Sequence, residues 1–329
     1  MRARWRGPFL LLPLLLAGCS TIQSALHPVG PEASRILDLT WVLFALAAFV
    51  TIIVLSALAL ALFGPDRARR RIADGRTIVA LGIVFPVVTL TALLGYGLWV
   101  MRENTSPSPA QPGLQVEVIG EQWWWRVHYR LPDGTIVASA NEVRIPTGRE
   151  VEFALRSADV IHSFWVPSLA GKLDMIPGRT NHLRFSADRP GVYRGQCAEY
   201  CGGAHALMAF EVVAMAPEDF DAWLAALPAT LPPPAEPEAT RGGELFVAAG
   251  CGGCHAVRGT AADGTTGPDL SRVGERRTIA AATLPNTPDN LARFIAEPSH
   301  IKPGVLMPPF TVLSADERRA ISLYLAGLR

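Results

Sequence analysis

The stretch that decides the fold reads Gln196-Cys197-Ala198-Glu199-Tyr200-Cys201-Gly202-Gly203-Ala204-His205-Ala206-Leu207-Met208. Its pattern, C-x-E-x-C-x-x-x-H-x-x-M, puts two thiols, an imidazole and a thioether within one short loop. Cysteine and methionine sulfur are soft ligands, and together with imidazole they suit copper better than calcium or magnesium. A second imidazole stands upstream at His162. The pattern therefore predicts a copper site.

The number of cysteines bears on the kind of copper site. A mononuclear blue-copper site needs one cysteine, two histidines and a weak axial methionine. With two cysteines available, both sulfurs can bridge a pair of copper ions, and each copper then takes one histidine as its terminal ligand. The thioether is expected to bind one copper weakly, and a main-chain carbonyl between the cysteines the other. The expected ligands are His162, Cys197, the carbonyl of Glu199, Cys201, His205 and Met208.

This loop resembles the copper A loop of cytochrome c oxidase subunit II, residue for residue. A bridged pair shares one electron over two metals, so its geometry changes little on redox cycling, and no position is left open for substrate. Two other interpretations of the same residues stay open. Cys197 and Cys201 can form a disulfide in an oxidising compartment, and with His162 and His205 they also make a plausible four-ligand zinc site.

The N-terminus reads as an export signal. Residues 1–18 combine a basic start with an apolar core too short to span a bilayer. Leu16-Ala17-Gly18-Cys19 resembles the lipobox of bacterial lipoproteins, which implies lipidation of Cys19. An ordinary signal peptide with an incidental cysteine is the alternative.

Two long uncharged stretches come next, and they predict a transmembrane hairpin over 36–102. The spans, about 39–64 and 77–101, each exceed the ~20 apolar residues that a bilayer-spanning helix needs. The arginine-rich loop between them, 65–76, is expected to face the cytoplasm. Pro86 is expected to kink the second span. The share of hydrophobic residues in the chain, 50%, agrees with membrane segments, and a net charge of +1 gives no argument for binding nucleic acid.

Residues 113–216 show short runs of alternating hydrophobicity between glycine, proline and aspartate turns, which predict an all-β sandwich or barrel. Such a fold can bring His162 beside the later loop. It matches the cupredoxin fold that the resemblance implies.

Two further stretches resemble the same family. In Gly120-Glu121-Gln122-Trp123-Trp124-Trp125, Trp123 stands where the family has the tryptophan that admits electrons. Trp124 and Trp125 are read as strand residues divided between core and interface, and the same reading stays open for Trp123. The run from Trp165 to Arg179 resembles the stretch that faces the core subunit.

In the family, the carboxylate at the Glu199 position also binds magnesium at that interface, with the Asp174 position nearby. Here these two carboxylates can equally be solvated or salt-bridged.

Residues 217–240 close the β domain and separate it from the C-terminal part of the chain. Helical spacing of apolar residues predicts an amphipathic helix over Pro217–Leu227. The proline-rich remainder, from Pro228 to Thr240, is expected to be a semi-extended spacer. Such a spacer would set the effective concentration of a tethered C-terminal domain.

The C-terminal part, 241–329, contains Cys251-Gly252-Gly253-Cys254-His255, the c-type haem attachment motif. In that motif Cys251 and Cys254 bond the haem covalently and His255 is an axial ligand of the iron. Met307 is the expected second axial ligand, with His300 as its rival. The domain resembles class I cytochrome c, and helices are expected at Gly242–Ala249, Asp289–Ala296 and Ala315–Gly327, the last opening with a capping box.

Together these features resemble subunit II of a caa-type cytochrome c oxidase, an enzyme whose oxygen chemistry lies in a partner subunit. The resemblance implies copper A, haem c and interface magnesium as cofactors, and core subunit I and further oxidase subunits as partners. It also implies an upstream cytochrome or a cytochrome bc-type complex as donor, and two spans in the bacterial inner membrane with the metal domains on the periplasmic side. No catalytic residue is assigned.

Two alternative functions stay open: the corresponding subunit of a copper A-containing nitric oxide reductase, and a stand-alone membrane-tethered electron carrier. One departure from the family concerns the proton path. Many members have a glutamate near the start of the second span, where this chain has Asp74 and no glutamate.

Overall fold

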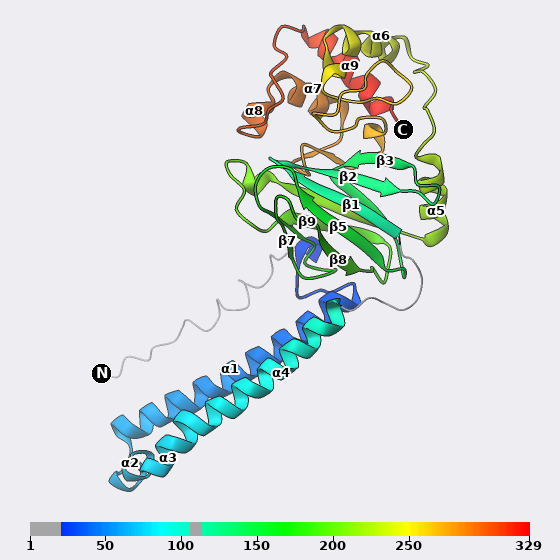
Figure 1. Ribbon diagram of the computed structural model, residues 1–329. Helices are drawn as coiled ribbons and strands as arrows, with labels where there is room; N and C mark the ends of the chain where they lie inside the picture. Colours follow the sequence, from blue (N-terminus) through cyan, green and yellow to red (C-terminus); the bar gives the residue numbers. More distant parts are fainter. Residues whose placement is uncertain (1–20, 106–113) are drawn as a thin grey trace, which may run out of the picture.

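The computed structural model describes residues 21–105 and 114–329. The expected signal sequence, 1–18, and the expected lipidation site, Cys19, lie outside the described residues. Figure 1 shows three parts in a row. A pair of long helices projects from one end of a β-sandwich, and a small helical domain covers the opposite end.

The projecting hairpin consists of two helices that are long and apolar enough to cross a membrane, Pro31–Phe63 and Gly75–Thr105. Their most apolar 18-residue stretches have mean hydropathies of 2.8 and 2.4. Their apolar side chains are exposed, as lipid-facing residues are. A short π-helical segment ends two residues before Pro86 in the second span. Because proline has no N–H to donate, local widening of the helix accommodates it. The elements in order are α1 (Pro31–Phe63), α2 (Asp66–Ile72), α3 (Gly75–Val79), the π-helical segment (Ala80–Val84) and α4 (Phe85–Thr105).

The start of α1 is fixed to the sandwich by main-chain hydrogen bonds. The Val29 N–H donates to the Ser168 carbonyl at 2.7 Å, and the Val29 carbonyl accepts from the Asp188 N–H at 2.8 Å. Gly30 lies so close to the main chain that a Cβ there would be 2.5 Å from the Ser186 carbonyl oxygen. The hairpin and the sandwich are therefore directly packed together.

The sandwich contains two five-stranded sheets, which confirms the cupredoxin-like fold expected from the alternating pattern. The first sheet has the order β3 (Ile136–Ala140), β2 (Trp124–Arg130), β1 (Leu114–Glu121), β5 (Val151–Ser157) and β8 (Asn181–Phe185). The second has the order β4 (Glu142–Pro146), β10 (Ala209–Met215), β9 (Gly191–Cys197), β6 (His162–Trp165) and β7 (Leu173–Met175).

Aromatic side chains fill the space between the sheets. The rings of Phe164 and Phe210 stack at 4.4 Å between centroids, and Trp125 meets Phe210 edge-on at 5.0 Å. Trp125 is completely buried, as expected for a core residue of its strand. This aromatic core lies beside the strand ends that carry the expected metal ligands.

The C-terminal part is helical, as expected. Its helix α9 begins with the capping box that the sequence predicts, in which the Ser314 hydroxyl accepts from the Glu317 N–H. Helix α6 begins at Pro237, inside the stretch expected to be spacer, because proline suits the first turn of a helix. The helices are α5 (Pro217–Ala226), which closes the sandwich, and then α6 (Pro237–Ala248), α7 (Pro288–Ala296), α8 (Pro298–Ile301) and α9 (Ala315–Gly327), with a small ladder of β11 (Thr278–Ile279) and β12 (Leu284–Pro285).

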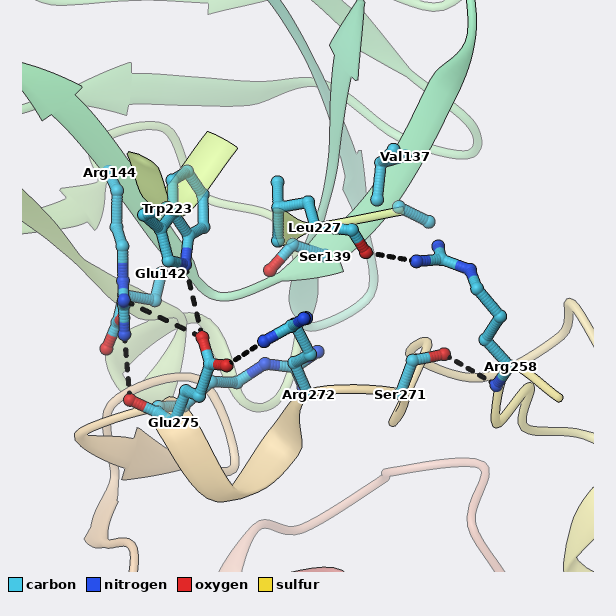
Figure 2. A pocket seen from close by; sticks show the side chains of 12 residues that line it. Val137, Ser139, Glu142, Arg144, Trp223, Leu227, Arg258, Ser271, Arg272 and Glu275 are labelled. Carbon is cyan, nitrogen blue, oxygen red and sulfur yellow. Dashed lines mark hydrogen bonds and ion pairs between the residues drawn. The ribbon is translucent and has the colours of Figure 1, made fainter. Parts of the chain in front are cut away.

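The helical domain is packed against the sandwich rather than held by the spacer alone. Figure 2 shows one part of this contact: Glu275 of the helical domain accepts from the Trp223 indole N–H at 3.1 Å and pairs with Arg144 at 3.7 Å. Beside it, the Arg277 N–H donates to the Glu142 carboxylate at 2.8 Å. The domain that the spacer was expected to tether is therefore also docked directly on the sandwich.

Candidate metal centre

Strand pairing brings the expected copper ligands together. In the second sheet β6 lies beside β9, with Phe164 opposite Cys197. His162, two residues before Phe164, therefore lies next to the loop that begins after Cys197. The Cys197 N–H donates to the Met208 carbonyl at 2.8 Å and closes that loop. The position of His162 depends on the register between β6 and β9, which the spacing of residues within the loop does not predict.

The side chains of the expected ligands converge on one point. The two sulfurs, of Cys197 and Cys201, lie 3.7 Å apart and are not bonded to each other. Each sulfur has one imidazole nitrogen beside it and one weaker neighbour. The distances are 3.9 Å from Cys197 Sγ to His162 Nδ1, 3.2 Å from Cys197 Sγ to the Glu199 carbonyl, 3.5 Å from Cys201 Sγ to His205 Nδ1, and 3.8 Å from Cys201 Sγ to Met208 Sδ.

The electrostatics of the two thiols fit a metal cation. Burial raises the pKa of Cys201 to about 12, and the neighbouring Cys197 sulfur adds to this shift. Burial also acts to raise the pKa of Cys197, but hydrogen bonds from His162 and the main chain outweigh it and leave the pKa lowered. Cys197 therefore loses its proton more easily than Cys201, whose thiolate needs a nearby positive charge. Bound metal supplies that charge, since it binds cysteine as thiolate.

His162 is oriented by residues that the sequence analysis gave no role. Its Nε2 lies 2.7 Å from Asp159 Oδ1, which leaves Nδ1 facing the sulfurs. The second oxygen of Asp159 accepts from the Gln122 N–H at 2.7 Å. Gly120 packs so closely on the imidazole that a Cβ there would lie 2.7 Å from its Cδ2 atom. A carboxylate behind a metal-ligating histidine is the arrangement that fixes its tautomer.

Trp123 connects the candidate copper loop to the helical domain. Its indole N–H donates to the Cys201 carbonyl at 3.0 Å, and the Gln122 side chain donates to the same oxygen at 2.7 Å. The far edge of the indole meets the helical domain, where a Cβ at Gly304 would lie 2.8 Å from the ring. Trp124 has a different neighbour: its ring lies 4.7 Å from the Arg126 guanidinium.

The haem attachment motif directly follows the first helix of the helical domain, α6. Cys251 begins a short 3-10 turn and packs against the core of the domain, as does Met307. His255 Nδ1 lies 2.8 Å from the Pro268 carbonyl, which fixes the ring and leaves Nε2 free for a ligand. His300, the rival of Met307, is exposed. The residue types present, two cysteines, an imidazole and a thioether, suit a c-type haem, and His255 and Met307 remain its predicted axial ligands.

The two carboxylates expected to bind magnesium, Glu199 and Asp174, are not part of the group of convergent metal-donor atoms formed by His162, Cys197 and Cys201. Glu199 lies between the two cysteines of the loop, and Asp174 lies on β7 opposite Ser163. Both are half-buried, and in the parts of the chain that the structure describes neither forms an ion pair. Their salt-bridged alternative thus has no support among these residues.

Comparison with known proteins places these sites in a family. The profile described as "Cytochrome C oxidase subunit II, periplasmic domain" matches residues 131–215, and the profile described as "Cytochrome c" matches residues 239–329. The protein named "Cytochrome c oxidase subunit 2" from Alkalihalophilus pseudofirmus is 34% identical over 98% of this chain and 96% of its own length. The protein of the same name from Bacillus subtilis is 32% identical over 100% of this chain and 99% of its own length.

The chain belongs to the cytochrome c oxidase subunit II family. Its matches to both relatives run through the hairpin, the sandwich and the helical domain. The two profiles imply a copper A centre in the sandwich and haem c in the C-terminal domain, as part of a haem–copper oxidase in a membrane. A solved structure of the periplasmic domain of subunit II (CoxB) of Bradyrhizobium japonicum is 29% identical over 37% of this chain and 97% of that chain, with a TM-score of 0.34.

Proposed function

We propose that this subunit II is the one through which electrons enter a caa-type cytochrome c oxidase. Electrons pass from its own haem c to its copper A centre, and from there to core subunit I, which reduces oxygen to water and pumps protons. The observation that carries this proposal is the position of Trp123, which contacts the copper loop through the Cys201 carbonyl and the helical domain through Gly304.

The copper pair and the haem supply one-electron redox chemistry when bound; the residues hold and orient them. Cys197 and Cys201 would hold the copper pair as thiolates, together with the donors His162, the Glu199 carbonyl, His205 and Met208. All six of these copper ligands are buried or half-buried, which would keep water away from the metals. Both centres are then filled by protein ligands, which favours electron transfer over substrate binding.

The helical hairpin supports a membrane location for the proposed subunit. The arginine-rich turn at α2 would face the cytoplasm, and both metal domains the periplasm, in a bacterial inner membrane. An upstream cytochrome or a cytochrome bc-type complex would reduce the haem. Glu199 and Asp174 would bind magnesium where the Trp165–Arg179 stretch meets the core subunit, because hard carboxylate oxygen suits that ion.

The first test counts metals in the full-length chain, purified in detergent after haem attachment and copper loading. A copper pair for each haem is expected, with an electron paramagnetic resonance spectrum in which one unpaired electron is shared by both copper nuclei. A single copper with a localised spin, or zinc in its place, would contradict the proposal.

A further inference from the structure

A buried lysine lies where the helical domain meets the copper loop. Lys302 is only 2% exposed, although lysine is rarely buried without a partner. Its ammonium donates to the Trp123 carbonyl at 2.5 Å, the Leu207 carbonyl at 2.9 Å and the Ala280 carbonyl at 3.2 Å. The three N–H donors of the side chain are thus matched by three acceptors.

The three carbonyl acceptors come from both domains. Ala280 belongs to the helical domain, as Lys302 does, but Trp123 and Leu207 belong to the sandwich. Leu207 lies in the copper loop, directly before the expected ligand Met208. Most of the polar contacts that make burial of this lysine tolerable therefore exist only when the two domains are together.

We propose that Lys302 is a positioning residue that locks the helical domain onto Trp123 and holds the indole between the two redox centres. The inference rests on the proposed function and adds the residue that fixes its geometry. The indole is held from both sides, by the Cys201 carbonyl and by Gly304.

The turn that supplies the third acceptor supports the lock. Ala280, Ala281 and Ala282 all have positive φ angles, between 54° and 58°, which alanine adopts at an energetic cost. In this conformation successive carbonyls reach across the interface. The Ala281 carbonyl accepts from the Ala209 N–H and the Ala282 carbonyl from Arg194, each at 3.2 Å. The strain is compensated by contacts between the domains.

The residue type is also informative. Arginine carries almost all positive charge in this chain, and lysine occurs only at Lys172 and Lys302. A compact ammonium can point its donors at three converging carbonyls, whereas a planar guanidinium fork cannot. Lys302→Arg is therefore expected to fail to restore the lock although it preserves the charge.

The decisive experiment compares the wild-type full-length chain with Lys302→Met. In the loaded protein, a flash excites an added photoreductant dye, which gives one electron to the haem and is itself restored by a sacrificial amine donor. The electron is then followed from haem to copper by absorbance. The variant is expected to transfer about tenfold more slowly with unchanged haem and copper spectra, because transfer must wait for a docked state populated roughly one part in ten. Arg319→Gln, at a side chain 59% exposed on α9, is the control and should transfer at the wild-type rate.

A second readout needs neither metal. The Ala209 amide donates across the interface, so its hydrogen–deuterium exchange reports docking directly. We expect faster exchange of Ala209 in Lys302→Met than in the wild type and in Arg319→Gln. An unchanged transfer rate, or unchanged exchange at Ala209, would overturn the proposal.

Two further observations keep the test decisive. If Lys302→Met does not assemble, Gly304→Ala leaves the lysine in place and puts a methyl group 2.8 Å from the Trp123 ring, so it should also slow transfer. If the wild type itself passes no electron from haem to copper, the proposed function fails. Exchange at Ala209 still shows in that case whether Lys302 docks the domains.

Discussion

At the scale of single residues, Asp159 contributes to the copper site without being a ligand. One of its oxygens fixes the ring of His162, and the other accepts from the main chain of Gln122, next to Trp123. Burial lowers the pKa of His162, but its hydrogen bonds to Cys197 and Asp159 outweigh that effect and leave the pKa raised. Copper must displace the proton that this environment favours, so copper binding is expected to weaken in acid.

Replacing Asp159 tests this support. In Asp159→Asn the imidazole loses its anionic partner, and copper affinity is expected to fall about 10-fold or more. Competition between the full-length chain and a copper chelator measures the affinity. Asp188→Asn changes an exposed aspartate of the same domain and serves as the control. Equal affinities for the two variants would remove Asp159 from the site.

Replacing Met208 tests the weak axial ligand. Leucine keeps the volume of the buried side chain and removes the sulfur, which lies 3.8 Å from Cys201 Sγ. In Met208→Leu copper is expected to remain bound, while its optical and electron paramagnetic resonance spectra and its potential shift, because the axial ligand tunes a copper–thiolate site. Spectra identical to those of the wild type would exclude Met208 as a ligand.

At the scale of elements, strand pairing positions the candidate copper ligands, and it also brings together an ion pair that makes the stability of the sandwich depend on pH. On the outer face of the first sheet, Glu152 of β5 accepts from Arg184 of β8 at 2.5 Å and lies 3.1 Å from His182. Burial raises the pKa of the Glu152 carboxyl, but the hydrogen bonds and charge of Arg184 outweigh it and lower the pKa below its usual 4.5. The stabilisation is therefore present above pH 4.5 and is lost as the pH falls through the lowered folded-state value.

Glu152→Gln removes that acid-labile contribution. The free energy of unfolding of the sandwich is expected to fall most at neutral pH, and its difference from the wild type to shrink as the pH drops below about 4.5. Denaturant unfolding of the full-length chain at a series of pH values, followed by tryptophan fluorescence, measures this difference. Glu244→Gln, on the exposed side of α6, should give no such trend. A difference independent of pH would contradict the ionic origin of the effect.

At the scale of the whole molecule, the two metal domains form a packed unit and not a pair joined by a loose tether. Lys302 and the alanine turn join them beside Trp123, and Glu275 joins them at Arg144 and Trp223. The proline-rich spacer therefore connects two domains that are already docked. The length of the spacer should therefore affect the rate of electron transfer between the domains far less than the contacts at the interface do.

Lengthening the spacer tests this conclusion. Inserting about ten glycine and serine residues between the exposed Pro232 and Pro233 adds well under 1 kcal/mol per doubling of loop length to the cost of docking. The rate of transfer from haem to copper is expected to change by less than about twofold. Flash reduction of the full-length chain measures it. A rate that falls severalfold would show that tethering, not docking, sets the encounter.

The sequence by itself determined the features that depend on near neighbours. The metal loop, the haem motif and the capping box at Ser314 can be recognised because their residues lie close together in the sequence. The two spans can be recognised because each is one continuous uncharged segment. Alternation of apolar residues likewise identified the β-sandwich, whose aromatic core the structure shows.

Tertiary structure alone decided which distant residues act together. Register between β6 and β9 brings His162 to the loop, and it places Asp159 behind that histidine. Lys302 meets Trp123 across 179 residues of sequence. No local pattern marks such partners, because a buried ammonium or carboxylate is defined by the acceptors and donors that folding gathers around it, and these come from separate strands and domains.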